Sequence, residues 1–353
     1  MSEKVLMKGN EALAEAAIRA GCHHFFGYPI TPQTELAAYM AKKLPKIGGT
    51  YLQAESEIAA INMVQGAGAA GIRAMTSSSS PGISLKSEGI SYMAGADVPG
   101  LIINVQRGGP GLGGIQPSQA DYWQATRALG HGDFHILVFA PSTVQEMVDL
   151  VGTAFDLSDA YRVPAMILAD GMLGQMMEPV SFKEEGEKTL PEKPWALTGH
   201  QGKRAHNVVN SLFLQANELE DKIAERFARY DRIREKECRF ADFMAEDAEI
   251  LVVAYGATAR VAQAAVKEAR AEGIKAGCFR PITLWPFPSA ELKRRAETTK
   301  AFLTVEMSRG QMIDDVKLAI DCSRPVEFFG RTGGVIPEPD EILAKIREMA
   351  GIL

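Results

Sequence analysis

The stretch YLQAESEIAAINMVQGAGAAGIRAMTSSSSPG, residues 51–82, decides the fold class because it holds a strand, a helix and a second strand in succession. The short apolar runs at 50–53 and 73–77 have the length and flanks of strands, and the segment at 56–70 between them has helical spacing. Two strands joined by a helix pair in parallel. The sequence therefore predicts a βαβ unit here, followed by a turn rich in hydroxyl groups.

The same alternation extends from this unit in both directions through the first half of the chain. Further strands are predicted at 23–27, 101–106, 136–140 and 165–169, with helices at 10–20, 32–44, 84–95, 118–129 and 143–160. This pattern predicts an α/β fold whose parallel sheet has helices on both faces. Ligands of such sheets bind beyond the carboxyl ends of the strands, so the residues that follow each strand are the candidates for a site.

The pattern changes after residue 180. The segment 181–245 begins as a polar, proline-containing connection and continues as a long charged helix, predicted over 209–240. This helix is expected to pack between domains, on a partner, or along its own domain. Strands and helices then alternate again, so we divide the chain into a first α/β domain at 1–180, the linker with its helix at 181–245, and a smaller α/β domain at 246–353.

Composition and charge narrow the class of protein. Of the 353 residues 46% are hydrophobic, but no apolar run approaches the roughly 20 residues of a membrane helix. No signal segment opens the chain, so we expect a cytoplasmic protein without membrane contact. The four cysteines are widely separated and indicate no iron–sulfur or zinc site. A net charge of −6 without a long basic run argues against nucleic acid as a partner.

Polar side chains at the strand ends are the candidate site residues. Thr31, between two prolines, suits a helix N-cap or an anion-binding position, with Pro32 as the first helical residue. Glu55 and Glu57 stand at the start of the next helix, where an acidic residue interacts favourably with the helix dipole. Arg107 closes an apolar strand and suits either a carboxylate ligand or a structural ion pair.

A second interpretation comes from the glycine-rich loop after the strand at 101–106. Gly109, Gly111 and Gly114 match G-x-G-x-x-G, which is typical of nicotinamide-dependent dehydrogenases. Pro110 lies inside the loop and no apolar helix follows it directly, so the turn that would hold a pyrophosphate is incomplete. The dehydrogenase stays as an alternative.

Taken together, GYPITP at 27–32, ESEIAA with GAGAAGIRAMTSSSSPG within 55–82, and NVQRGGPGLGG at 104–114 resemble the α subunit of 2-oxoacid:ferredoxin oxidoreductases, nearest to the branched-chain type. These thiamine-diphosphate enzymes convert 2-oxoacids and CoA to acyl-CoA, CO₂ and reduced ferredoxin. The resemblance covers nearly the whole chain. It implies a pyrimidine-binding domain first, a transketolase-C-terminal-like domain last, and 3-methyl-2-oxobutanoate as the substrate.

The resemblance also implies roles for single residues. Glu57 matches the catalytic glutamate that shares a proton with the aminopyrimidine ring of the cofactor, although Glu55 lies close enough to be considered. Thr31 and Arg107 match positions that hold the substrate carboxylate. The motif within 55–82 is therefore expected to supply the proton-sharing group, and the motifs at 27–32 and 104–114 the substrate site.

Further cofactor contacts are expected around the same motifs. The family commonly has Ser after the second proline of the first motif, whereas this chain has Gln33 and Thr34, so the local contacts differ there. The positions that match cofactor-binding residues are Tyr28, Pro29, Ser78 and Ser79.

The resemblance implies that another subunit supplies half of the cofactor site. A cradle for diphosphate and Mg²⁺ has Gly-Asp-Gly followed by Asn, whereas HGD at 131–133 and ADG at 169–171 lack this continuation. A β subunit is therefore expected to hold the diphosphate, Mg²⁺ and an iron–sulfur cluster. A γ subunit and a ferredoxin-like δ subunit complete the complex and pass electrons to external ferredoxin. A scaffold subunit without catalytic function is the second alternative.

Overall fold

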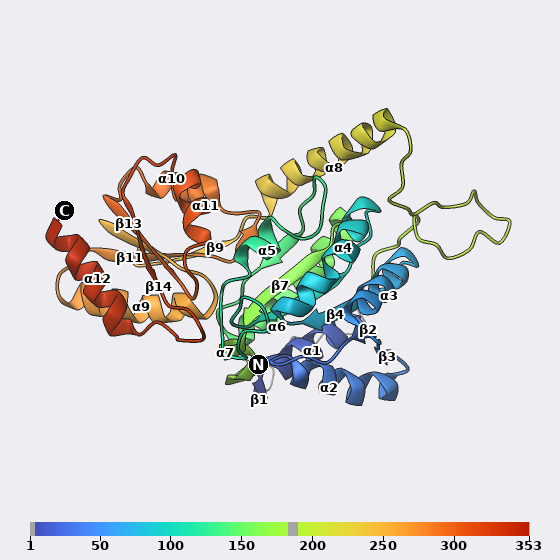
Figure 1. Ribbon diagram of the computed structural model, residues 1–353, viewed down its shortest axis with the longest axis horizontal. Coiled ribbons are helices and arrows are strands. Elements are labelled where there is room, and N and C mark those ends of the chain that lie inside the picture. Colours follow the sequence, from blue (N-terminus) through green and yellow to red (C-terminus); the bar gives the residue numbers. More distant parts are fainter. Residues whose placement is uncertain (1–3, 183–189, 353) are drawn as a thin grey trace.

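A seven-stranded sheet forms the centre of the first half of the chain in the computed structural model, which describes residues 4–182 and 190–352 (Figure 1). The order across it is β12 (Thr283–Trp285), β6 (Leu137–Phe139), β7 (Ala165–Asp170), β5 (Leu101–Gln106), β4 (Ala74–Ser78), β2 (His24–Gly27) and β3 (Thr50–Gln53). All neighbouring strands pair in parallel except β12, which is antiparallel to β6 at the edge. β5 and β7 are buried along their whole length, as expected for strands covered on both faces.

Helices cover both faces of this sheet, as predicted. They are α1 (Gly9–Arg19), α2 (Thr34–Lys43), the short η1 (Leu44–Ile47), α3 (Glu57–Ala69), α4 (Ser80–Gly95), α5 (Tyr122–Thr126), α6 (Val144–Tyr161) and α7 (Gly171–Gln175). The Ser77 hydroxyl donates to Gln33, just before α2, whereas the Ser78 hydroxyl points at the start of α4. Because neighbouring side chains of a strand face opposite ways, α2 and α4 lie on opposite faces.

A five-stranded sheet with its own helices makes up most of the chain after residue 246 (Figure 1). Its strands, in order, are β14 (Val326–Gly330), β13 (Ala301–Glu306), β10 (Ile250–Val253), β11 (Ala276–Pro281) and β9 (Phe240–Phe243), with helices α9 (Gly256–Ala271), α10 (Ser289–Arg295), α11 (Met312–Ala319) and α12 (Pro339–Ile352). β9 pairs antiparallel with β11, and the other pairs are parallel. The chain leaves this sheet after β11 to add β12 to the first sheet, although the sequence analysis assigns β12 to the second domain.

The sequence analysis missed some short elements and overextended others. β1 (Lys4–Lys8) pairs antiparallel with β8 (Met177–Ser181) in a two-stranded sheet that was not predicted. The helix predicted at 118–129 is wrong in length, because only α5 within it is helical. The side chains of Gln119 and Asp121 bond to groups outside this segment and hold the residues before α5 in an irregular conformation.

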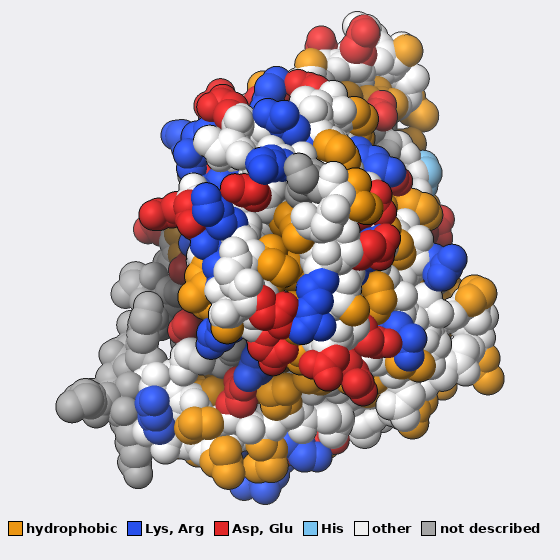
Figure 2. Space-filling model, turned by 90° about the vertical axis from the view of Figure 1, so that its left-hand side faces the viewer, with side chains coloured by type: hydrophobic (Ala, Val, Ile, Leu, Met, Phe, Trp, Pro, Cys, Tyr) orange, Lys and Arg blue, Asp and Glu red, His pale blue; other side chains and the backbone are white. Residues whose placement is uncertain are grey.

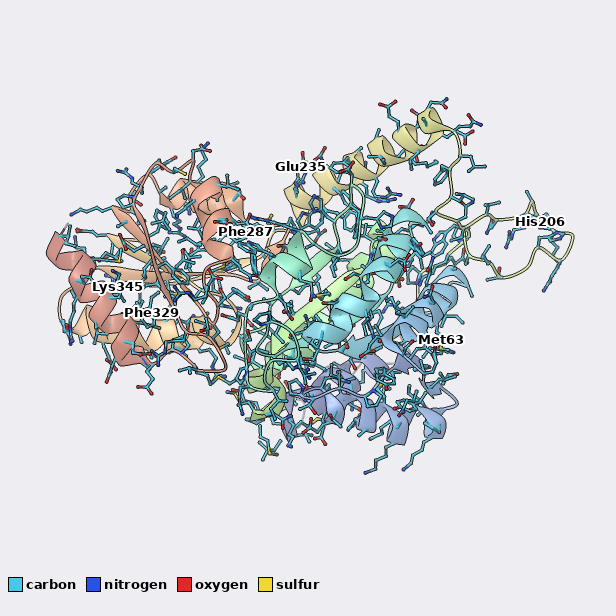
Figure 3. All side chains as sticks on the ribbon, in the orientation of Figure 1. Met63, His206, Glu235, Phe287, Phe329 and Lys345 are labelled. Atoms are coloured by element: carbon cyan, nitrogen blue, oxygen red, sulfur yellow. The ribbon has the colours of Figure 1, made fainter. Side chains whose placement is uncertain are left out.

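The long charged helix α8 (Ala216–Lys236) is shorter than predicted and lies along the top of the molecule in Figure 1. Its C-terminal half is packed on the edge of the first sheet, where the buried Tyr230 contacts the rings of His135 and Trp285. The segment before α8 projects away from both sheets, and Figure 3 labels His206 on it. At its C-terminal end the helix therefore packs along its own chain, one of the predicted arrangements.

Gln119 connects the second sheet and its helices to the first. It has no exposed surface. Its side-chain amide donates to the Tyr255 carbonyl at 2.8 Å and accepts from the Thr258 hydroxyl at 2.7 Å and the Met307 amide at 3.0 Å. Each of these partners, if left unbonded in the interior, would cost about 1–3 kcal/mol. The contact therefore fixes the second half of the chain beside the loop that follows β5.

The face of the molecule in Figure 2 mixes the two signs of charge. Lys and Arg side chains are interspersed there with Asp and Glu, without a dominant patch of one sign. Nucleic-acid-binding proteins usually carry a basic stripe, which this face does not have. Within residues 4–182 and 190–352, no helix is both long and apolar enough to span a membrane.

Candidate active site

The candidate site lies at the carboxyl ends of β2, β4 and β5, the edge at which parallel sheets bind ligands. Glu57 is the first residue of α3, and the Ser56 hydroxyl caps this helix by accepting from the Ala59 amide at 3.2 Å. Glu57 is only 6% exposed, whereas the side chain of Glu55 is exposed. Of the two acidic residues, Glu57 is the one that points into the protein.

Gly82 brings α3 and α4 together at Glu57. A Cβ atom at Gly82 would lie 2.1 Å from Ser78 Oγ and 2.8 Å from Glu57 Oε1, so a side chain does not fit there. Gly89 makes the same kind of contact one turn further along α3, where its Cβ would lie 2.4 Å from Ile61 Cγ2. The two glycines let the Glu57 carboxylate and the Ser78 hydroxyl approach one point of α4.

Three hydroxyl groups at the end of β4 have no hydrogen-bond partner within residues 4–182 and 190–352. Thr76 Oγ1, Ser78 Oγ and Ser79 Oγ are buried, and the described residues offer none of them a hydrogen bond. Buried polar atoms are nearly always bonded in folded proteins, and leaving one unbonded costs about 1–3 kcal/mol. The cluster therefore indicates a ligand with polar atoms next to Glu57.

Lys86 is a further buried polar residue, and the sequence analysis missed it. It lies on α4 one turn after Gly82, has no exposed surface, and its Nζ has no hydrogen-bond partner in the described part of the chain. Burial lowers the pKa of Lys86 to about 8, while the Glu57 carboxylate acts in the opposite direction. Helical spacing could have predicted that Lys86 is buried, because it lies on the same side of α4 as the buried Ile83 and Ile90.

Arg107 and Thr31 lie side by side. The Arg107 guanidinium donates to the Thr31 carbonyl at 3.0 Å and to the Leu112 carbonyl at 3.2 Å, and its Nε is buried without a partner among the described residues. The structural ion pair considered from the sequence is not found within the described ranges, because these bonds go to backbone carbonyls. A guanidinium has five N–H donors, so donors remain for an anion.

The predicted N-cap at Thr31 is wrong. α2 begins three residues later with Gln33 as its N-cap, and Thr31 and Pro32 form a turn before it. Asn10 donates to the Pro32 carbonyl at 2.7 Å, and Ser77 donates to the Gln33 side chain at 2.5 Å. These buried bonds hold the turn outside the helix, so the exposed Thr31 side chain has no capping role.

Asp121 links the start of α4 to the end of β5. Its carboxylate accepts from Ser80 Oγ at 2.6 Å and from Asn104 at 2.9 Å, and the Arg107 amide donates to Ser80 Oγ at 3.0 Å. Burial raises the pKa of Asp121, and the bonds from Ser80 and Asn104 oppose this shift. The network fixes Arg107 relative to the turn after β4. No local sequence motif predicts this hydrogen-bond network, because its residues are far apart in the sequence.

The glycine-rich loop at 108–116 is not a dinucleotide-binding turn. The irregular segment 107–121 separates β5 from α5, so no helix N-terminus follows the glycines. The loop instead contacts the second half of the chain, where a Cβ at Gly334 would lie 2.3 Å from the Cβ of Gln116. The nicotinamide alternative therefore lacks the geometry that it needs.

The rim of the site, formed by residues 28–29 and 112–115, is exposed and partly apolar. Leu112 and Ile115 are 85% and 57% exposed, and Tyr28 is 37% exposed. Pro29 is exposed as well. These residues belong to the loops that carry Thr31 and Arg107, and their side chains lie at the surface rather than in the interior.

Comparison with protein families identifies the chain. The thiamine-diphosphate-binding domain of pyruvate flavodoxin/ferredoxin oxidoreductases matches residues 15–232, and pyruvate:ferredoxin oxidoreductase core domain II matches residues 248–342. The chain belongs to the pyruvate flavodoxin/ferredoxin oxidoreductase family. These oxidoreductases act on 2-oxoacids, so the predicted enzyme class is confirmed.

Relatives within this oxidoreductase family extend over almost the whole chain. The chain is 50% identical to the ketoisovalerate oxidoreductase subunit VorB of Methanothermobacter marburgensis, over 98% of each chain. It is 38% identical to the 2-oxoglutarate synthase subunit KorA of the same organism, over 99% of this chain and 100% of the relative. The resemblance to the branched-chain type of α subunit is therefore confirmed.

Solved structures support the same fold. The chain matches the 2-oxoglutarate:ferredoxin oxidoreductase from Magnetococcus marinus, solved with 2-oxoglutarate, coenzyme A and succinyl-CoA, with a TM-score of 0.85 at 28% identity. The match covers 98% of this chain but 65% of that one, so this chain spans just under two thirds of that relative. A split-gene transketolase, an inactive β4 tetramer, matches with a TM-score of 0.60 at 15% identity. The fold predicted for a thiamine-diphosphate enzyme is confirmed.

The residues at this site fit the pyrimidine half of thiamine diphosphate. A buried carboxylate beside hydroxyls that are unbonded among the described residues offers both acceptors and donors to a polar ring, and the missing side chain at Gly82 lets Glu57 and Ser78 approach each other. Among the described residues there is no group of three or more His, Cys, Asp or Glu that could hold a metal ion. The fit on this chain therefore concerns the ring of the cofactor.

The buried Lys86 should make the stability of this chain depend on pH in a defined window. Its pKa is about 8 in the folded chain, below the ordinary lysine value of 10.5, so the unfolded chain keeps the proton to higher pH. Stability should therefore rise between about pH 8 and pH 10.5, by about 3 kcal/mol in total for this residue. Lys86→Met should lose this rise, measured by urea unfolding across that window.

The exposed Lys203 provides the matched control for this measurement. Lys203→Met should keep the pH dependence of the wild-type chain, because an exposed ammonium group is hydrated in both states. Identical pH dependence in Lys86→Met and the wild type would show that the ammonium group of Lys86 is not held in a desolvated position.

Proposed function

We propose that this chain is the α subunit of an oxidoreductase that converts a branched-chain 2-oxoacid and CoA to acyl-CoA, CO₂ and reduced ferredoxin. The observation that supports it best is the buried Glu57 carboxylate, which lies beside Gly82 together with the Ser78 hydroxyl, a group left unbonded by the described residues. Thiamine diphosphate, when bound, supplies the carbanion chemistry that releases CO₂. The residues of this chain hold its ring and the substrate.

Glu57 is the group that shares a proton with the ring nitrogen of the aminopyrimidine. Its burial keeps water away, so its carboxyl group bonds to the ring instead of to solvent. Its place in the first turn of α3 adds the positive end of the helix dipole, which favours the ionised carboxylate. The hydroxyls of Ser78 and Ser79 would bond polar atoms of the cofactor, and Tyr28 and Pro29 would contact it from the open rim.

Arg107 and Thr31 hold the carboxylate of the 2-oxoacid in this proposal. Arg107 is oriented by two backbone carbonyls, which leaves further N–H donors for the substrate. The exposed Thr31 hydroxyl adds a donor beside it. A fixed guanidinium with an adjacent hydroxyl holds a carboxylate in one orientation, which exposes its neighbouring 2-oxo carbon to the cofactor.

A β subunit completes the site by covering its open rim. Exposed apolar side chains gathered on one surface commonly mark a protein–protein interface. A partner placed there would bring the residues for diphosphate and Mg²⁺ and an iron–sulfur cluster, and γ and ferredoxin-like δ subunits would carry electrons to external ferredoxin. Exposed apolar residues on the elements around the site include Tyr28, Ile58, Leu85, Leu112, Ile115 and Trp123.

The substrate is assigned as 3-methyl-2-oxobutanoate. The loop at 108–116 next to Arg107 contains Leu112 and Ile115 but neither Lys nor Arg. It therefore offers an aliphatic side chain of the substrate an apolar contact and offers a second carboxylate no cation. The 50% identity to the ketoisovalerate subunit, against 38% to the 2-oxoglutarate subunit, supports the same assignment.

Replacing Glu57 by Gln in the assembled complex tests the central residue. We expect turnover of the 2-oxoacid to fall by roughly 10²- to 10⁴-fold, because general acid–base catalysis contributes about that factor. Size-exclusion chromatography should show an intact complex. Glu55→Gln is the matched control and should stay active, because Glu55 is exposed. Near-normal turnover of the Glu57→Gln complex would reject the role of Glu57 and favour a non-catalytic scaffold.

Replacing Arg107 by Met tests the substrate site. Loss of charge-assisted hydrogen bonds of about 1.5–3 kcal/mol should raise the KM for the 2-oxoacid roughly 10- to 100-fold, with a smaller effect on kcat. Arg19→Met, which removes an exposed guanidinium far from the site, is the control. An unchanged KM would indicate that Arg107 does not bind the substrate and only holds the loop in place.

The substrate assignment is tested with a panel of 2-oxoacids. The co-purified complex, supplied with CoA and a viologen dye, should show kcat/KM for 3-methyl-2-oxobutanoate at least about tenfold above that for 2-oxoglutarate, because burying an unpaired carboxylate is unfavourable. A preference for 2-oxoglutarate would contradict the branched-chain assignment without affecting the role of Glu57.

A further inference from the structure

Lys86 lies on the face of α4 that meets α3. Gly82 and Gly89, the two contact points of this face with α3, stand four residues before and three residues after Lys86. At 3.6 residues per turn, all three positions share one side of the helix. On α3 the opposing positions are Glu57 and Ile61. Lys86 is therefore buried on the side of α4 that faces α3 and Glu57.

Glu57 is the charge that acts on Lys86. α4 packs mainly against α3 and β5, and Glu57 is the single Asp, Glu, Lys, Arg or His among the residues of those two elements. His131, against the Tyr92 ring, and Arg226, which donates to the Gly95 carbonyl, meet α4 six and nine residues beyond Lys86. On α4 itself, Glu88 is exposed and bonded by the Tyr92 hydroxyl. Asp121 touches the first residue of α4, but its carboxylate is already bonded by Ser80 and Asn104.

A buried ammonium group without a hydrogen bond destabilises the folded chain. Its desolvation cost is several kcal/mol before any compensation, and an apolar side chain of the same length would avoid it. In natural proteins, such a local conflict with packing is found mainly at functional sites. The position of Lys86 therefore calls for a role at the neighbouring carboxylate rather than a role in packing.

We propose that Lys86 is a positioning residue that acts through Glu57: its ammonium group keeps the Glu57 carboxylate ionised before thiamine diphosphate binds. This inference rests on the proposed function, in which Glu57 shares a proton with the ring. With the carboxylate ionised, a proton is taken up from solvent when the ring nitrogen arrives, and it lies between that nitrogen and Glu57. A positive charge close to a buried carboxyl group favours the ionised form of that group.

Proton uptake on cofactor binding tests this directly and does not depend on turnover. Thiamine diphosphate with Mg²⁺ is titrated calorimetrically into the cofactor-free complex near neutral pH, in buffers with different heats of ionisation. The wild-type complex should take up more protons than Glu57→Gln, by about one proton per site. Lys86→Met should lose most of that difference. Glu88→Gln, which removes a charge from the solvent side of the same helix, should match the wild type.

The variants separate the failure of this inference from failure of the proposed function. Equal proton uptake by the wild type and Glu57→Gln would show that Glu57 shares no proton with the ring. Both the proposed function of Glu57 and the inference about Lys86 would then be rejected. A lower uptake in Glu57→Gln together with wild-type uptake in Lys86→Met would overturn the role of Lys86 alone.

Kinetics and stability provide two more readouts for Lys86. In Lys86→Met the acid limb of the pH–rate profile should move up by about one pH unit, with an unchanged KM for the 2-oxoacid. A raised KM with an unmoved acid limb would make Lys86 a substrate ligand and overturn the inference.

The unfolding temperature of the Lys86→Met variant at neutral pH should equal or exceed that of the wild type. A clear decrease would show that Lys86 serves packing and would overturn the inference. Lys86→Gln, also neutral and of similar length, repeats the test should the Met variant not assemble.

Discussion

The close approach of α3 to α4 is the constraint on which the rest of this site depends. It requires the absence of a side chain at Gly82 and Gly89, where a Cβ would lie within 3 Å of Glu57 and Ile61 atoms. A larger residue at either position would separate the helices and expose the start of α3 to water. With the helices in contact, a carboxylate at a helix N-terminus is buried beside hydroxyls at a strand end. The parallel sheet supplies that strand end. The two glycines allow the helix contact that shields the carboxylate from water.

Much of the fold could be predicted from the sequence, because local patterns specify it. The strands at 50–53 and 101–106 have the predicted bounds. Each is a short run of strand-forming residues, and the residues that follow it belong to a turn or loop. The errors occur where contacts distant in sequence decide. β12 has three residues and exists because β6 pairs with it. The helix predicted over 118–129 is shortened because side chains at its start bond to other parts of the chain.

The candidate site was predictable in its location but not in its internal bonding. Residues after parallel strands must meet at one edge, so Thr31 and Arg107 could be expected near each other, and they are joined by a hydrogen bond. The capping role of Thr31 failed because Asn10 and Ser77, distant in sequence, hold the turn before α2. Lys86 was missed for a similar reason, since spacing along a helix does not reveal which charge faces it across a gap.

Burial has opposite consequences for polar groups in two parts of this molecule. The buried Gln119 and the half-buried Asp121 have their side chains hydrogen-bonded, and they hold the molecule together. The hydroxyls at the end of β4 and the ammonium group of Lys86 are buried without partners among the described residues, so they weaken the folded state at one place. A ligand that bonds these groups would remove that cost, so its binding would be linked to folding stability at this edge of the sheet. The unsatisfied groups thus favour the loaded state over the empty one, which a fully bonded interior could not do.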